Sequence, residues 1–224
     1  MSNLASFLKS PKKLLEKLKE RNSKAKEKQA KRNQHLAELC VLEEKYGVDF
    51  AGYVPDTKEL GTDSAFCNGY EAAYPMPEIF NFLNIKEGDT LLDVGSGKGY
   101  AMYLFSTFPF SRIDGVELSK KLVEISRANL SKLFPEQEGR FTVYCENALD
   151  FDRLGEYNYI FMYNPFPRDV IEQFVEKLSA SAMKREGKLT VIYQNPQKGS
   201  LFEESGVFKT VLIKNGTAIF ESKF

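Results

Sequence analysis

An apolar run that ends in a glycine-rich loop limits, more than any other feature, how this chain can fold. Residues 90–94 (TLLDV) have the composition of a buried strand, and the loop after them carries Gly95, Gly97 and Gly99 at alternate positions. Glycine lets a backbone turn sharply and approach a ligand closely. The following residues, 100–108, have the pattern of a helix, so the loop joins a strand to a helix in the manner of α/β folds.

Strand-like and helix-like segments alternate from about residue 76 to the end of the chain. The expected strands are residues 90–94, 112–118, 140–147, 159–164 and 188–195, and the expected helices are residues 77–83, 100–108, 120–134 and 168–184. Two further alternating segments flank Asn215-Gly216 within residues 208–224, which is a strong hairpin signal. The sequence therefore predicts an α/β fold with a doubly wound, mainly parallel, seven-stranded sheet and a C-terminal antiparallel hairpin.

The N-terminal part of the chain has a different composition. Residues 1–35 hold 11 Lys or Arg and 3 Asp or Glu, whereas residues 36–224 hold 20 and 28. Ser10-Pro11 is a typical helix start, and the next strong breaker is Gly47, which suits the position just past a helix end. We therefore divide the chain into residues 1–62, a basic helical extension with a linker, and residues 63–224, an acidic globular domain.

Five basic residues of this extension are spaced so that they share one face of a helix. They are Lys17, Arg21, Lys24, Lys28 and Lys31. Like charges at this spacing repel one another, and a polyanion would relieve the repulsion. The basic helix at 11–35 is a candidate binding surface for RNA, an anionic membrane surface or an acidic glycan. The alternative is a solvated lysine-rich helix or an oligomer contact.

Composition excludes several classes of protein and site. No apolar run approaches the roughly 20 residues of a membrane span, and the N-terminus lacks the apolar core of a signal peptide. The three cysteines lie far apart, at Cys40, Cys67 and Cys145, and His35 is the single histidine. We expect neither a disulfide framework nor a metal site, and we expect a cytoplasmic location, with peripheral attachment to a membrane as an option.

Two common ligands of glycine loops fit the sequence poorly. A triphosphate-binding loop has the pattern GxxxxGK[ST]. When its Gly-Lys pair is placed on Gly97-Lys98, the first glycine falls on Leu92 and the Ser or Thr falls on Gly99. A dinucleotide fingerprint needs a third glycine where Tyr100 stands. A triphosphate bound by a loop of that type is excluded, and NAD is disfavoured.

The remaining pattern, D-x-G-x-G-x-G at residues 93–99, resembles that of the class I S-adenosylmethionine-dependent methyltransferases, over roughly residues 70–224. The resemblance implies S-adenosylmethionine as cofactor and S-adenosylhomocysteine as product. The resemblance places Asp93 near the ammonium end of the cofactor, Glu117 at its ribose hydroxyls and Asn147-Ala148 at the edge of its adenine. The family usually has an acid where Asn147 stands. The implied cofactor-binding residues are Asp93, Gly95, Ser96, Gly97, Gly99, Glu117, Asn147, Ala148 and Asn164.

The end of the fourth strand, Asn164-Pro165-Phe166-Pro167, resembles the [DN]PP[YFW] motif of amino-group methyltransferases. In that family the carbonyl groups of the motif orient the amine toward the methyl group, and the aromatic ring stacks on a planar acceptor. Phe166 replaces the second proline here, and the shorter Asn-Pro-Phe pattern is similar to that of less characterised bacterial members. A Tyr-Glu pair upstream, Tyr70-Glu71, fits a position over the cofactor. The candidate catalytic residues are Asn164, Pro165, Phe166, Glu71 and Tyr70.

These observations lead to one expected function and two alternatives. We expect a methyltransferase that acts on a nitrogen or an oxygen of an acceptor that the sequence does not identify. Glu71 or Tyr70 would accept the proton or orient the nucleophile. The alternatives are a non-catalytic module that uses its basic arm on RNA or a membrane, and an NAD-dependent oxidoreductase, which Tyr100 opposes.

Overall fold

The computed structural model describes residues 11–54, 70–137 and 139–224. The expected cap Ser10, the boundary between residues 62 and 63, and Cys67 lie outside the described residues. The side chains of Lys17 and Lys24 are also outside the description.

A seven-stranded sheet forms the centre of the domain. Its strands are β3 (Thr90–Val94), β4 (Arg112–Glu117), β5 (Phe141–Cys145), β6 (Tyr159–Tyr163), β7 (Thr190–Gln194), β8 (Phe208–Lys214) and β9 (Thr217–Ser222). The order is β5-β4-β3-β6-β7-β9-β8, with the first five strands parallel and β9 antiparallel to both its neighbours. The predicted doubly wound sheet with a terminal hairpin is confirmed. Strand order reverses between β3 and β6, and ligands of such sheets bind at the carboxyl ends of the strands at this switch point.

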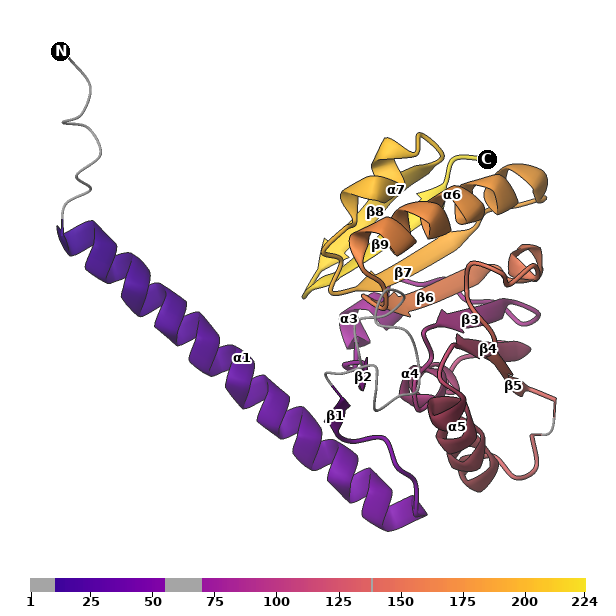
Figure 1. Cartoon of the computed structure of the whole chain (residues 1–224), viewed down its shortest axis with the longest axis horizontal. Coiled ribbons are helices and arrows are strands. Elements are labelled where there is room, and N and C mark those ends of the chain that lie inside the picture. The colour runs from indigo at the N-terminus through magenta and orange to yellow at the C-terminus, as the bar shows by residue number, and fades with distance from the viewer. Residues whose placement is uncertain (1–10, 55–69, 138) are drawn as a thin grey trace.

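Helices cover both faces of the sheet, as Figure 1 shows. They are α3 (Pro77–Phe80), α4 (Tyr100–Phe105), α5 (Lys120–Leu133), α6 (Arg168–Lys184) and α7 (Ser200–Glu204), with a short 3-10 helix, η2 (Leu154–Glu156). Alternate residues of each strand face opposite layers. Leu92 and Ile160 join the core under α6 and α7, whereas Leu91 and Phe161 join the core under α4 and α5.

The N-terminal extension is one long helix, α1 (Pro11–Tyr46), and Gly47 follows it with a φ of +66°. Most of α1 extends away from the domain, and only its C-terminal part lies beside the body (Figure 1). Residues 19–34 are exposed, apart from Lys24, whose side chain is not described, while His35 and Leu39 are buried. A short antiparallel ladder, β1 (Tyr53–Val54) with β2 (Tyr70–Glu71), follows; it has too few residues for periodicity to predict.

Candidate cofactor and acceptor sites

The glycine loop leaves β3 and turns at the switch point of the sheet. Gly95 and Gly97 have φ values of +72° and +54°, a left-handed conformation that other residues adopt at a cost. A β-carbon at Gly95 would stand 2.7 Å from Cβ of Pro165, and one at Gly97 would stand 2.5 Å from the ring of Tyr70. Both positions therefore require glycine, because the backbone is in close contact with Pro165 and Tyr70.

Asp93 lies at the start of this loop and is only 2% exposed. Its Oδ2 has no hydrogen-bond partner among the described residues. Burial raises the pKa of Asp93 well above its ordinary value, and the negative charge of Glu117 adds to the effect. A buried carboxylate oxygen with an open acceptor position suits a cationic group such as an ammonium ion.

Glu117 ends β4 beside the loop. One carboxylate oxygen accepts a hydrogen bond from the Gly97 backbone N–H (3.0 Å) and the other from the Ser119 backbone N–H (2.8 Å). Burial raises the pKa of Glu117, and these two hydrogen bonds oppose the shift. Each carboxylate oxygen can accept more than one hydrogen bond, so the fixed carboxylate can still accept both hydroxyls of a vicinal diol.

Three smaller residues complete the predicted cofactor set. Ser96 is buried, and its hydroxyl has no partner within the described ranges. The Asn147 side chain accepts a hydrogen bond from the Leu149 backbone N–H (3.0 Å) and so fixes the turn after β5. Ala148 is buried in the core under α6. The structure thus brings the glycine loop and Glu117 into direct contact and places the Asn147 turn after the neighbouring strand.

Asn164 follows β6 in a left-handed conformation, with a φ of +39°. Its Oδ1 accepts hydrogen bonds from the Tyr193 hydroxyl (2.9 Å) and from Lys198 Nζ (3.3 Å). The next residue, Pro165, is the one that contacts Gly95, so the Asn-Pro segment packs directly on the glycine loop. Phe166 is buried against Phe174, with ring centroids 5.5 Å apart. Its ring is part of the core under α6.

The predicted Tyr70-Glu71 pair is split by the alternation of β2. The Tyr70 ring packs on Gly97, and its hydroxyl donates to the Phe50 carbonyl (2.6 Å). Burial raises the pKa of Tyr70 well above its ordinary value, and the charges of Asp49 and Glu43 add to the shift. Tyr70 therefore acts as a wall over the loop, and its hydroxyl is not a proton acceptor at neutral pH.

Glu71 lies on the other side of β2. It accepts hydrogen bonds from the hydroxyls of Tyr163 (3.1 Å) and Tyr74 (3.3 Å), and it forms an ion pair with Arg32 of α1 (3.1 Å). Tyr163 ends β6, so these contacts connect α1 to the switch point of the sheet. Burial raises the pKa of Tyr163 and of Tyr74, and the charge of Glu71 adds to both shifts, so both tyrosines donate to the carboxylate.

The segment after α1 is fastened to the glycine loop by Lys98. The Lys98 ammonium pairs with Asp49 and donates to the Ala51 carbonyl (2.7 Å). Glu43 accepts hydrogen bonds from the backbone N–H groups of Phe50 and Ala51, at 2.6 Å each. The sequence analysis did not predict this role of Lys98, because a lysine between glycines is typical of a solvent-facing turn. Its position inside the glycine motif is the only feature of the sequence that could have indicated the role.

Two cavities meet at Glu71 and Ala72, which line both. The smaller cavity, of about 20 Å³, lies against the glycine loop and is lined by Tyr70, Asp93, Gly95, Ser96, Tyr100 and Tyr163, among others. It holds little more than a water molecule.

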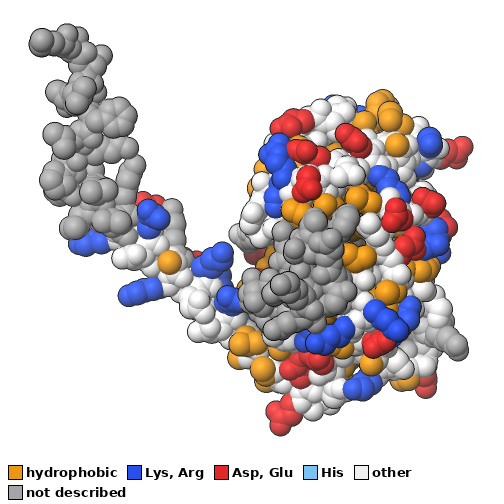
Figure 2. Space-filling view, in the orientation of Figure 1, with side chains coloured by type: hydrophobic (Ala, Val, Ile, Leu, Met, Phe, Trp, Pro, Cys, Tyr) orange, Lys and Arg blue, Asp and Glu red, His pale blue; other side chains and the backbone are white. Residues whose placement is uncertain are grey.

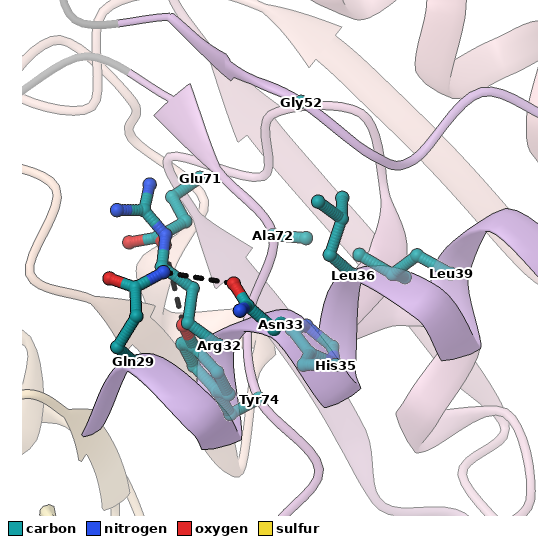
Figure 3. Close-up of a pocket in the computed structure, with 10 residues that line it drawn as sticks. All are labelled: Gln29, Arg32, Asn33, His35, Leu36, Leu39, Gly52, Glu71, Ala72 and Tyr74. Carbon is teal, nitrogen blue, oxygen red and sulfur yellow. Dashed lines mark hydrogen bonds and ion pairs between the residues drawn. The ribbon is translucent and has the colours of Figure 1, made fainter. Parts of the chain in front are cut away.

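The larger cavity, of about 270 Å³, lies between α1 and β2, and we call it the α1–β2 pocket (Figure 3). The α1 residues that line it are Gln29, Arg32, Asn33 and His35, and Figure 3 shows Arg32 beside Glu71 and His35 beside Tyr74. The sequence analysis named Glu71 but gave no site role to the α1 residues of this pocket. The sequence pointed to this part of the chain through its single histidine, His35, and through the basic face predicted for helix 11–35.

Among the described residues, no cluster of His, Cys, Asp and Glu has the arrangement of a metal site. The same residues contain no helix that is both long and apolar enough to cross a membrane.

Comparison with known proteins agrees with this geometry. The model of the protein-L-isoaspartate(D-aspartate) O-methyltransferase (PCMT) family matches residues 9–180, which include the glycine loop, Glu117 and the Asn164 segment. The chain belongs to the PCMT methyltransferase family. It is therefore an S-adenosylmethionine-dependent methyltransferase, as predicted, and neither the oxidoreductase nor the non-catalytic alternative receives support.

Individual relatives are more distant. The ribosomal protein L11 methyltransferase of Thermotoga maritima is 29% identical over 102 residues, which are 41% of this chain and 39% of the relative, so the chain spans about two fifths of that protein's length. A structure described as an S-adenosyl-L-methionine-dependent methyltransferase of Methanococcus maripaludis is 19% identical, with a TM-score of 0.51 over 66% of this chain and 82% of that one. An RNA methyltransferase of Salinibacter ruber, solved with S-adenosyl-L-homocysteine, is 17% identical, with a TM-score of 0.50 over 67% of this chain and 92% of that one. These structures show the shared fold.

Proposed function

We propose that this methyltransferase transfers its methyl group to a nitrogen, or alternatively an oxygen, of an acceptor bound in the α1–β2 pocket. The position of Glu71 carries the proposal, because this residue lines both the pocket and the cavity at the glycine loop. A carboxylate between the two is suitably placed to orient the acceptor or to receive its proton.

On the cofactor side, the proposed roles follow the local chemistry. Asp93 binds the ammonium end of S-adenosylmethionine with its open carboxylate oxygen, and Glu117 accepts hydrogen bonds from the ribose hydroxyls. Gly95, Ser96, Gly97 and Gly99 form the backbone surface on which the cofactor lies. Asn147 and Ala148 border the adenine.

Around the reacting atoms, the chain supplies positioning rather than a strong base. When bound, S-adenosylmethionine would supply an electrophilic methyl group on its sulfonium sulfur, for transfer to the acceptor nitrogen with the carbon–sulfur electron pair left on sulfur. Asn164 and Pro165, packed on the glycine loop, orient the nucleophile, and the Glu71 carboxylate accepts the proton that the methylated nitrogen releases. Phe166 supports Asn164 from the core, and Tyr70 closes the loop.

The basic extension is proposed as a polyanion-binding arm, with residues 1–62 as the extension and linker and residues 63–224 as the methyltransferase domain. Lys and Arg side chains project along the described part of α1 (Figure 2), and they face solvent. RNA, an anionic membrane surface or an acidic glycan are the candidate partners of helix 11–35, and a cytoplasmic location, with or without peripheral membrane attachment, is consistent with each.

Two measurements test this proposal. Calorimetric titration should give micromolar binding of S-adenosylmethionine and S-adenosylhomocysteine and no binding of NAD; absence of adenosyl binding would contradict the cofactor roles. Glu71→Gln should lower the turnover number at least about tenfold and leave the affinity for S-adenosylhomocysteine almost unchanged. Equal losses in Glu71→Gln and in a control variant at a distant acid, Glu203→Gln, would show that Glu71 has no special role.

A further inference from the structure

The α1–β2 pocket combines features that favour one class of acceptor. Its volume of about 270 Å³ is below the range for drug-sized ligands, so it admits a single ring system or side chain rather than a whole cofactor. Leu36, Leu39 and Ala72 give it apolar walls, and Gln29 and Asn33 give it amide groups. Apolar walls with a few amide groups suit a flat, polar-edged group.

His35 gives this pocket an aromatic and polar wall. The side chain is 6% exposed, and neither ring nitrogen has a hydrogen-bond partner within the described residues, although the Ala73 backbone lies close to the ring. Its ring packs against Tyr74, with centroids 4.5 Å apart, and lies near Tyr100 at 5.6 Å. Burial lowers the pKa of His35, so the buried ring is neutral and contributes a planar aromatic surface to the wall of the pocket.

Tyr74 lies beside His35 in the wall of the pocket, and its backbone is held in place by the sheet. The Gln194 side chain at the end of β7 accepts a hydrogen bond from the Tyr74 backbone N–H (2.8 Å) and donates one to the Tyr74 carbonyl (2.9 Å). This pair of hydrogen bonds fixes the backbone of Tyr74. The His35 ring covers one side of the Tyr74 ring, and the rest of the Tyr74 ring is a fixed aromatic surface against which a planar group can pack.

A line of basic side chains leads along α1 to this pocket. Arg21, Lys28 and Lys31 are exposed, and His35 follows Lys31 by four residues, so all four lie on one face of the helix. From Arg21 to His35 this face is about 21 Å long at the rise of an α-helix. Between residues 19 and 34 the helix has no apolar residue larger than alanine, so this stretch lacks the apolar face that insertion into a membrane requires.

From these observations we propose that the acceptor is a single-stranded nucleic acid, with its phosphates along the basic face of α1 and one base in the α1–β2 pocket. The base packs against Tyr74, and the amides of Gln29 and Asn33, which are joined by a hydrogen bond of 2.9 Å, bind its polar edge through their remaining polar atoms. Phosphate contacts on a basic track combined with base stacking on aromatic side chains are the general way in which proteins bind single strands. The inference rests on the proposed function, because it names the acceptor of that same site.

Fluorescence anisotropy of the full chain tests this inference. The probes are RNA and DNA single strands of about twelve nucleotides in the same sequence, the same RNA with abasic positions, inorganic polyphosphate, and vesicles that contain phosphatidylserine. We expect both single strands to bind, and the abasic strand to bind at least about fivefold more weakly, because it loses base stacking. Equal binding of intact and abasic strands, or stronger binding of polyphosphate or vesicles, would overturn the inference.

Variants separate the basic track from the pocket. Lys28→Gln with Lys31→Gln should reduce the slope of log K against log salt concentration by about 1.4, because two phosphate contacts are lost. The matched control, Lys184→Gln with Lys209→Gln, removes the same charge from exposed lysines of α6 and β8 and should leave the slope unchanged. Gln29→Ala with Asn33→Ala should weaken binding of the intact strand and not of the abasic strand.

Titration with S-adenosylhomocysteine, performed on the same preparations, distinguishes this inference from the proposed function. If S-adenosylhomocysteine binds and no single strand does, the nucleic-acid acceptor is wrong and the cofactor assignment stands. If the single strands bind as expected and S-adenosylhomocysteine does not, the cofactor roles are wrong.

Discussion

The ring of Tyr70 lies against Gly97 so closely that a β-carbon at position 97 would stand 2.5 Å from the ring. This contact joins the N-terminal part of the chain to the cofactor loop, because the Tyr70 hydroxyl is bound to the Phe50 carbonyl. The loop, the segment after α1 and β2 therefore form one packed unit. The glycine loop and the segment after α1 are connected through this unit.

Gly97→Ala is expected to disrupt this unit. In this variant a non-glycine residue has to adopt the left-handed conformation, which lowers the free energy of unfolding by about 1–2 kcal/mol. Its β-carbon also clashes with the Tyr70 ring. Gly187→Ala is the matched control, since Gly187 has a φ of +77° and a β-carbon added there would meet nothing within 4 Å. Urea unfolding should show a larger loss for Gly97→Ala, and only this variant should bind S-adenosylhomocysteine more weakly. Equal behaviour of the two variants would mean that the Tyr70 contact is unimportant.

Asp93→Asn should increase stability and decrease cofactor affinity. Because burial raises the pKa of Asp93 above its value in the unfolded chain, the folded chain binds more protons between those two pKa values. The free energy of unfolding therefore falls as pH rises through this interval and stays lowered above it. The neutral amide carries no such penalty, so the variant should be more stable at pH 7, and the difference should shrink toward about pH 3.9.

The measurement for Asp93 is the difference between the unfolding free energies of the two proteins across pH. The raised pKa of Glu117 changes stability with the same sign, so the curve of the unmodified protein alone does not isolate Asp93. Affinity for S-adenosylhomocysteine should fall at least about tenfold, the usual effect of losing a charge-assisted hydrogen bond. Unchanged affinity would remove Asp93 from the cofactor site.

Asn164→Ala should lower turnover by about a hundredfold and change the dissociation constant of S-adenosylhomocysteine by less than about threefold. Asn195 offers a matched control, since it also follows a strand, β7, in a left-handed conformation with a φ of +53°. Asn195→Ala shares the backbone strain and should retain turnover. If both variants lose turnover equally, strain rather than the Asn164 side chain accounts for the loss.

Lys98→Met should loosen the segment that covers the loop. The variant loses the ion pair with Asp49 and the hydrogen bond to the Ala51 carbonyl. Amide hydrogen exchange at Phe50 and Ala51 should become about tenfold faster, while exchange in β4 should not change. Lys120→Met, which removes an exposed ion pair with Glu124, is the control. Unchanged exchange at Phe50 and Ala51 would show that Lys98 is not needed to hold the segment.

Local sequence determined much of this protein. Alternating apolar patterns predicted the five parallel strands and the final hairpin, because residues that face a core repeat with the period of their own element. The helix from Pro11 to Tyr46 followed from its terminal Pro and Gly signals, since helix ends depend on neighbouring residues only. The order of Asp93, the glycines and Glu117 indicated the cofactor for the same reason: each lies at the end of a strand, and parallel strands bring those ends together.

Only the tertiary structure decided how the remaining residues act. Periodicity does not report contacts between distant segments, such as Glu71 with Tyr163 or Lys98 with Asp49. The burial of Phe166 against Phe174 and the pairing of Glu71 with Arg32 depend on how α6 and α1 pack on the sheet. The residues of the glycine loop could therefore be recognised from the sequence, whereas the α1–β2 pocket exists only because α1 packs beside β2.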